Sequence, residues 1–417
     1  MNEERLRELL RDAPVPDEAA AEERGLRVVQ AAFEEHRPPR ASSRRRSLLV
    51  AVAAAVLGLA LLLTPAGAEV GDWIGDRLQI DDDQAAPALT RLPSGGHLLV
   101  DSRDGVWVVS PDGSKRRLGE YDEGSWSPNG RFVAVAGGHQ LTAVDPIGNA
   151  RWSLSRPRQV SLPRWSPSGY RVSYLSGDEL RVVAGDGTDD RILDSEVAPV
   201  AAAWQPDLNP LLNEGDHVLA FADRDRVVRV VNADLGTELA RASAADVTAL
   251  DWSGDASELL VAGPRIVQVF DPGGGRLPKA EKRREPATAR LLASSLSPAG
   301  ARTTAAAFAP AGNSFALTRV LPPGAGGLEH SELVLVRRNA GELSERRLLL
   351  VSGAITDLAW SPDGDWLLVA WRDADQWLFV PLSGGRKLGV GNIGREFDPG
   401  GLGSTAFPSI AGWCCRP

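Results

Sequence analysis

The stretch Trp360-Ser361-Pro362-Asp363-Gly364 decides the fold of this chain. Short apolar residues precede it, and the apolar run 366–371 follows it. Proline presets the backbone angle of a turn, aspartate bonds the turn backbone, and glycine accepts the positive φ that reverses the chain. The stretch therefore predicts a strand, a tight turn and a second strand.

This unit recurs along the chain. Residues 126–130 read Trp-Ser-Pro-Asn-Gly, residues 165–169 read Trp-Ser-Pro-Ser-Gly, and four other copies are more divergent. The seven copies begin at Leu92, Trp126, Trp165, Trp204, Trp252, Phe308 and Trp360. Their starts are 34, 39, 39, 48, 56 and 52 residues apart, mostly the length of a four-stranded propeller blade. We therefore predict an all-β fold, a β-propeller of about seven four-stranded blades over residues 89–417, with six or eight blades as alternatives.

The first residue of each copy is a bulky apolar side chain at the same place in its blade. We interpret these seven side chains as structural plugs between blades. A partial eighth copy, residues 407–413, ends in Trp413. It predicts that the C-terminal strand returns beside the first blade and closes the ring, which removes exposed sheet edges.

The outer hairpins carry a resemblance to known repeat families. Residues 105–118 and 180–193 each read as a strand, an Asp-Gly turn, a basic residue and a leucine, which resembles TolB-type propeller repeats. Residues 144–152 and 231–239 are more similar to quinoprotein-type repeats. We call the repeated stretch that begins with the bulky apolar residue, such as residues 360–364, the Trp turn. With these hairpins and Trp turns, the chain resembles the TolB-like and WD40-like β-propeller repeat proteins.

An uncharged run of 22 residues, 47–68, is long enough to cross a bilayer as a helix. Arg44, Arg45 and Arg46 precede it and acidic residues follow it, which favours a cytoplasmic N-terminus. We predict a single-pass protein of a bacterial cell membrane with the propeller outside the cytoplasm. The alternative is a secreted product, because Ala66-Gly67-Ala68 fits a signal-peptide cleavage site.

Residues 1–46 would form the cytoplasmic segment, and residues 69–88 a linker between the span and the propeller. Two short amphipathic helices are expected in the segment, because apolar residues recur at helical spacing and Pro14 and Pro38 interrupt the pattern. Such helices either dock to a partner or form a weakly ordered tail. The layout resembles bacterial membrane-bound anti-sigma regulators, which implies a sigma factor as cytosolic partner. One histidine, His36, and no cysteine leave no zinc site in the segment.

Charge and cysteine content narrow the function classes. The net charge of −9 lies entirely after residue 68, because residues 1–46 hold ten acidic and ten basic side chains and residues 47–68 hold none. Such an acidic domain argues against nucleic acid and anionic lipid as its partners. Cys414 and Cys415 are adjacent, and we expect free thiols there, since a disulfide between neighbours needs an uncommon ring.

We find no catalytic, cofactor-binding or metal-binding motif, and therefore predict no cofactor. Residues 389–394 match a dinucleotide-binding glycine pattern, but we expect no helix through residues 395–401 to complete it. The five histidines are scattered singly without metal-ligand spacing. The insertions 276–290 and 321–329 are candidate binding loops.

Three functions are compatible with these observations. The first is a non-catalytic, membrane-anchored propeller that binds a protein or ligand outside the cytoplasm, and that acts as a transmembrane sensor or anti-sigma-like regulator. The second is a passive TolB-like envelope scaffold. The third is a propeller enzyme, a glycosidase or quinone-dependent dehydrogenase, using channel carboxylates that sequence cannot place.

Overall fold

The computed structural model describes residues 88–206, 217–244, 246–273, 285–323, 327–339, 342–399 and 407–415. All described residues belong to one compact unit. The predicted cytoplasmic segment and membrane span, with Arg44, Arg45 and Arg46, lie outside the described residues, as does all of the linker except residue 88. Among the described helices, none is long and apolar enough to cross a membrane.

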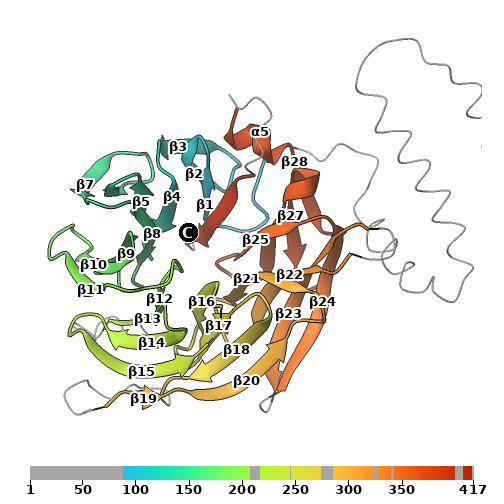
Figure 1. Ribbon diagram of the computed structural model, residues 1–417. Coiled ribbons are helices and arrows are strands. Elements are labelled where there is room, and N and C mark those ends of the chain that lie inside the picture. Colours follow the sequence, from blue (N-terminus) through green and yellow to red (C-terminus); the bar gives the residue numbers. More distant parts are fainter. Residues whose placement is uncertain are drawn as a thin grey trace, which may run out of the picture. The chain divides into compact units, whose positions relative to one another are not determined.

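Seven sheets, antiparallel except for one added strand in the fourth, form the seven blades of a β-propeller, which confirms the predicted fold class (Figure 1). From the inside outwards, the first blade consists of β29 (Ser409–Cys414), β1 (His97–Ser102), β2 (Gly105–Val109) and β3 (Lys115–Gly119). The second consists of β4 (Glu123–Trp126), β5 (Val133–Gly137), β6 (Gln140–Val144) and β7 (Ala150–Ser155). The third consists of β8 (Val160–Trp165), β9 (Arg171–Ser176), β10 (Glu179–Ala184) and β11 (Arg191–Asp194). The fourth blade consists of β12 (Ala203–Trp204), β13 (Val218–Ala222), β14 (Val227–Asn232), β15 (Thr237–Ser243) and β19 (Ala287–Thr288). The fifth consists of β16 (Ala249–Trp252), β17 (Leu259–Ala262), β18 (Ile266–Asp271) and β20 (Arg290–Leu296). The sixth blade consists of β21 (Arg302–Phe308), β22 (Phe315–Leu321), β23 (His330–Asn339) and β24 (Glu342–Ser352). The seventh consists of β25 (Ile355–Trp360), β26 (Trp366–Trp371), β27 (Gln376–Pro381) and β28 (Leu388–Gly391).

The innermost strands form a closed ring, because each contacts the innermost strand of the next blade all the way round. The C-terminal strand β29 pairs antiparallel with β1, with Leu98 opposite Trp413. This pairing confirms the predicted closure. The C-terminal end of the described chain therefore lies near the centre of the ring (Figure 1).

The Trp turns between first and second strands share one hydrogen-bond pattern. In the seventh blade, Gly364 has a φ of 78° and its N–H donates to the Ser361 carbonyl. The buried Ser361 hydroxyl accepts the N–H of Trp366, five residues later, at 2.9 Å. The same serine bond is made by Ser127, Ser166 and Ser253 in their own blades. In these four blades the serine hydroxyl holds the start of the second strand.

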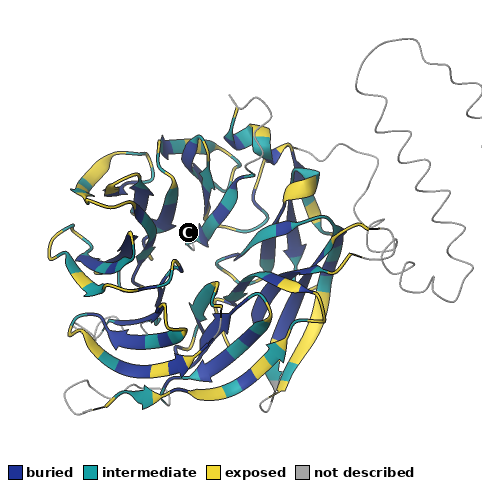
Figure 2. Cartoon of the chain, in the orientation of Figure 1, coloured by how far each residue is buried: buried dark blue, intermediate teal, exposed yellow. Residues whose placement is uncertain are grey.

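Each plug lies in a separate apolar core between two blades. Seven clusters of buried side chains occupy the seven boundaries. The most continuous buried runs lie on the second strands of the blades (Figure 2). Six contain the aromatic residue that begins a Trp turn, which is Trp126, Trp165, Trp204, Trp252, Phe308 or Trp360. In the cluster between the seventh and first blades, the corresponding position belongs to Trp413.

Leu92 does not hold the plug position that the sequence predicted for it. It is buried, at 2% exposure, but it precedes β1 and lies outside any strand. In the first blade the repeat is split: Trp413 is the last residue but one of the inner strand, and residues 92–96 lead into the second strand. The Trp413 indole donates to the Gly95 carbonyl at 3.0 Å and so joins the two halves. We call residues 92–96 and 413–415 the split turn.

One strand crosses from blade to blade. β19 follows β18 of the fifth blade in sequence but pairs in parallel with β15 of the fourth. Part of the predicted loop 276–290 is therefore strand, whereas its basic residues 279–284 lie outside the described residues. The other predicted loop, 321–329, joins β22 to β23.

A short helix, α5 (Ile393–Phe397), follows β28, contrary to the sequence prediction. Its ends, Ile393 and Phe397, are buried in the core between the seventh and first blades, which explains why it forms. The Gly394 N–H donates to Asp375 at 2.6 Å, so a carboxylate already occupies the start of this helix. A single-turn 3-10 helix, η3 (Arg372–Ala374), joins β26 to β27.

The up-and-down order of strands separates the loops into two faces. The Trp turns and the turns between third and fourth strands lie at one end of the blades, which we call the turn face. Turns between second and third strands and the connections between blades lie at the other end, the connection face. The split turn belongs to the turn face.

Candidate functional site

The plug indoles tie blades together at three of the seven boundaries. Trp204, Trp252 and Trp360 each donate from Nε1 to the carbonyl just before the plug of the preceding blade, at 3.0–3.1 Å. The acceptors are Arg164, Ala203 and Ala307. We call these the indole boundaries.

Carboxylates tie the remaining four boundaries. Asp101, Glu123, Asp251 and Asp357 each accept a backbone N–H from the inner strand of the next blade. Their donors are Gly124, Leu162 at 2.8 Å, Phe308 at 2.7 Å and Ile410. At two of these boundaries, the plug indoles of Trp126 and Trp165 are buried and donate to no described residue. We call these the carboxylate boundaries. Each of the seven boundaries thus has either an indole bond to a backbone carbonyl or a backbone N–H bond to a carboxylate.

The four carboxyl groups titrate abnormally because they lie deep in the ring. Burial raises the pKa of Asp251 to about 6, although N–H donors and Arg164 partly offset it. Burial also raises the pKa of Asp357 to about 6. Burial and the nearby charge of Glu123 raise the pKa of Asp101 well above its usual range, and burial raises that of Glu123. Burial lowers the pKa of Arg164, opposed by these acids.

A chain of hydrogen bonds joins the third and fourth blades on the turn face. Ser168 Oγ lies 2.7 Å from His217 Nε2, and His217 Nδ1 lies 2.6 Å from Asp234. Burial opposes ionisation of Asp234, but hydrogen bonds from His217 and Arg171 outweigh it and hold the pKa of that carboxyl well below its usual range. An ionised Asp234 accepts the Nδ1 proton, which leaves Nε2 to accept the Ser168 hydroxyl.

The residue types of this network are those of a catalytic triad, but its geometry serves the turn. Ser168 holds the fourth position of its Trp turn and accepts the Tyr170 N–H, as Asp363 accepts that of Asp365 in the seventh blade. The Gly169 N–H is bonded to the Ser166 carbonyl. The backbone N–H groups of Gly169 and Tyr170, which follow Ser168, are therefore both engaged within the turn. The network fixes the boundary.

Two exposed apolar side chains flank this network. Tyr170 is 55% exposed and packs edge-on against the His217 ring, with centroids 6.3 Å apart. Leu235 is 56% exposed and directly follows Asp234. The Tyr170 N–H donates to Ser168 of the network, and the Leu235 N–H donates to Asn232 in its own turn, so both side chains project from hydrogen-bonded turns. Large exposed aromatic and apolar groups on a rigid frame are typical of protein-binding surfaces.

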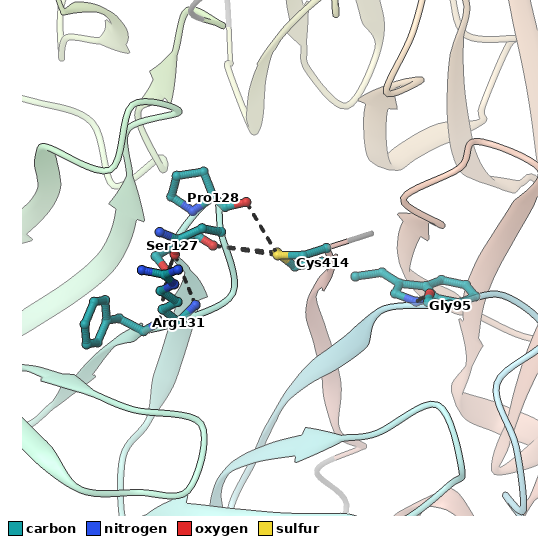
Figure 3. Close-up of a disulfide and its surroundings, with 9 residues drawn as sticks. Gly95, Ser127, Pro128, Arg131 and Cys414 are labelled. Carbon is teal, nitrogen blue, oxygen red and sulfur yellow. Dashed lines mark hydrogen bonds between the residues drawn. A yellow bond between two sulfur atoms is a disulfide. The ribbon is translucent and has the colours of Figure 1, made fainter. Parts of the chain in front are cut away.

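Cys414 and Cys415 form a disulfide, so the expectation of free thiols was wrong. They follow the plug Trp413 at the two positions where the turns of the second, third and seventh blades have serine and proline. Cys414 Sγ lies 3.6 Å from the Ser127 carbonyl, in the turn of the second blade (Figure 3). Cys415 Sγ lies 3.6 Å from the Pro128 carbonyl. The disulfide therefore lies where the split turn meets the neighbouring Trp turn.

Among the described residues, no group of three or more His, Cys, Asp and Glu side chains is arranged to hold a metal ion. Sequence reasoning missed both the Ser168–His217–Asp234 network and the inner carboxylates. The network joins residues 49 and 17 positions apart, and no local pattern marks such a contact. The carboxylates did carry a signal, because Asp251 and Asp357 interrupt otherwise apolar inner strands one and three residues before a plug.

Comparisons with solved structures place this fold among WD40-like propellers. The β-propeller domain of Cps50 (Swd1) from Myceliophteria thermophila is 17% identical, with a TM-score of 0.53 over 67% of this chain and 95% of that one. A chain of the Mitotic Checkpoint Complex is also 17% identical, with a TM-score of 0.50 over 72% and 92%. No protein-family model matches the sequence, and comparison with curated proteins finds no significant relative. The fold is thus a seven-bladed, WD40-like β-propeller.

Proposed function

We propose that this chain is a membrane-anchored, extracytoplasmic propeller that binds a protein partner on its turn face and has no catalytic activity of its own. The observation that carries this proposal is the pair Tyr170 and Leu235, exposed on two turns that the Ser168–His217–Asp234 network joins. A preorganised surface loses little entropy on binding. The WD40-like fold is commonly a protein-binding frame, which adds general support.

The N-terminal sequence supports the anchor and a signalling role. The apolar run 47–68 and the flanking Arg44, Arg45 and Arg46 favour a single span with the propeller outside. The amphipathic segment 1–46 would then meet a cytosolic partner, for which the anti-sigma-like layout suggests a sigma factor. In this arrangement the propeller senses an envelope protein and the segment transmits the signal.

The binding surface is tested by affinity purification of the full-length protein from membranes, with partners identified by mass spectrometry. The double variant Tyr170→Ser/Leu235→Ser should lose its extracytoplasmic partner. The matched control Leu296→Ser/Leu328→Ser changes two exposed leucines, 73% and 62% exposed, on the connection face and should retain it. Equal recovery of partners by both variants would contradict the proposed surface.

The signalling role is tested separately by deleting residues 2–38. Loss of a cytosolic regulator from the purified complex would support transmembrane signalling. Identical partners with and without the deletion would instead favour the passive TolB-like scaffold.

The raised pKa values of the inner carboxyl groups favour the enzyme as a second candidate, because active sites often contain such groups. Their bonds to neighbouring inner strands already give them a structural role. Turnover of a glycoside, or a thermal shift with pyrroloquinoline quinone, that is abolished by Asp357→Asn would support the enzyme over the binding protein.

A further inference from the structure

The disulfide lies at the one place in the ring where the chain is interrupted. Cys414 is the last residue of β29 and pairs with His97 at the start of β1. In the other six blades the first strand directly precedes the second strand in the sequence. The chain has no other cysteine, so only this pair can exchange with an external thiol.

Stabilisation does not explain this bond. A disulfide restricts the unfolded chain more as its loop grows longer, and one between adjacent residues closes the shortest loop there is. It also does not link β29 to β1 or to another blade. The bond therefore adds little to the ring by the usual entropic route, and its role must lie in its chemistry.

The surroundings of the disulfide make it both reachable and coupled to the closure. Cys414 and Cys415 are each only partly buried, on the turn face. The backbone lies close on both sides: a Cβ added to Gly96 would lie 2.6 Å from the Cys414 carbonyl oxygen, and one added to Gly130 would lie 3.0 Å from Cys415 Sγ. Two separate thiols occupy more space than one bonded pair, so we expect reduction to shift the end of β29 or the turn at Gly130.

We propose that Cys414–Cys415 is a thiol–disulfide exchange site for a dithiol, and that its reduction loosens the pairing of β29 with β1. One thiolate of the dithiol attacks a protein sulfur, the other cysteine leaves as a thiolate and takes up a proton, and a mixed disulfide forms. The second thiolate of the dithiol then displaces the remaining cysteine. Two electrons and two protons pass to the protein, and the dithiol leaves as a disulfide.

The biological setting rests on the proposed function, because disulfides persist in extracytoplasmic compartments and are kept reduced in the cytosol. The chemistry itself needs neither a membrane nor a partner. A failed partner experiment would therefore leave the exchange test unaffected.

The exchange is tested on the full-length protein in detergent, with dithiothreitol as the dithiol and N-ethylmaleimide as the label, read by intact mass. We expect no label before reduction and two labels after reduction without denaturant. Two labels before reduction, or none after native reduction, would overturn the proposal.

The structural consequence is read by hydrogen–deuterium exchange of the same protein. Reduction should speed amide exchange in residues 409–414 and 97–102 at least several-fold and leave β16 and β17 unchanged. The variant Cys414→Ser/Cys415→Ser should show no response to dithiothreitol. Unchanged exchange of β29 and β1 in the reduced native protein would refute the loosening.

Discussion

The three indole boundaries and the four carboxylate boundaries both join neighbouring blades by a bond between a side chain and the backbone. The side chain is the donor at the first kind and the acceptor at the second. At an indole boundary a neutral N–H donates to a backbone carbonyl of the preceding blade, as Trp360 does to Ala307. At a carboxylate boundary an acid accepts a backbone N–H of the next blade, as Asp251 does from Phe308. Both satisfy a buried backbone group, but only the acid carries a charge. The difference teaches that the ring has pH-independent and pH-dependent joints.

Removing a plug should have the largest effect at either kind of boundary. Trp360→Ala deletes a buried indole and should lower the free energy of unfolding by about 3–5 kcal/mol. Guanidinium unfolding of the full-length protein, followed by tryptophan fluorescence, measures this loss. The exposed substitution Leu296→Ser serves as control and should change stability by less than about 0.5 kcal/mol.

Removing a carboxylate should break one joint without opening a large cavity. Asp251→Ala leaves the N–H groups of Trp252 and Phe308 without their acceptor and should cost about 1–3 kcal/mol at neutral pH. Thermal unfolding of the variant measures the loss. A variant as stable as the parent protein would show that the carboxylate does not hold this boundary.

Because Asp251 carries a charge, its contribution to the free energy of unfolding should depend on pH. The folded-state pKa of Asp251, about 6, exceeds the unfolded value of about 3.9. The folded protein therefore binds this proton more tightly, and stability rises as pH falls from about 6 to about 4. Between pH 7.5 and 4.5, the parent should gain about 1–2 kcal/mol relative to Asp251→Asn, allowing for partial exposure. Parallel pH profiles of the two proteins would contradict this.

The smallest effect should separate the two kinds of boundary directly. Trp360→Phe removes the indole hydrogen bond to the Ala307 carbonyl, whereas Trp165→Phe removes an indole N–H that has no described partner. The first should cost about 1 kcal/mol more than the second. Denaturation midpoints of the two variants test the difference, and equal midpoints would show that the indole bond contributes nothing.

Sequence alone predicted the architecture because the fold is built from one short chemical motif. Turn residues such as Pro362 and Gly364 act locally, so their spacing revealed the blades. The same reasoning misassigned Leu92, because the first repeat is divided between the two ends of the propeller. The plug of the first blade is Trp413, for which the sequence predicts only a place in the strand that closes the ring.

Contacts between blades could not be predicted in the same way. The partner of His217 is Ser168 in another blade, and each residue is unremarkable within its own segment. The inner acids are similar, because Asp251 is a local irregularity until its acceptor role toward Phe308 is seen. Such contacts depend on which strands the ring brings together.

The strand β19 has a consequence for the inheritance of this ring. Because a segment of the fifth blade completes the edge of the fourth, these two blades are not interchangeable modules. A gene rearrangement that duplicated, deleted or swapped either one alone would separate β19 from its pairing partner. Recombination can preserve both sheets only by moving the fourth and fifth blades as one heritable block.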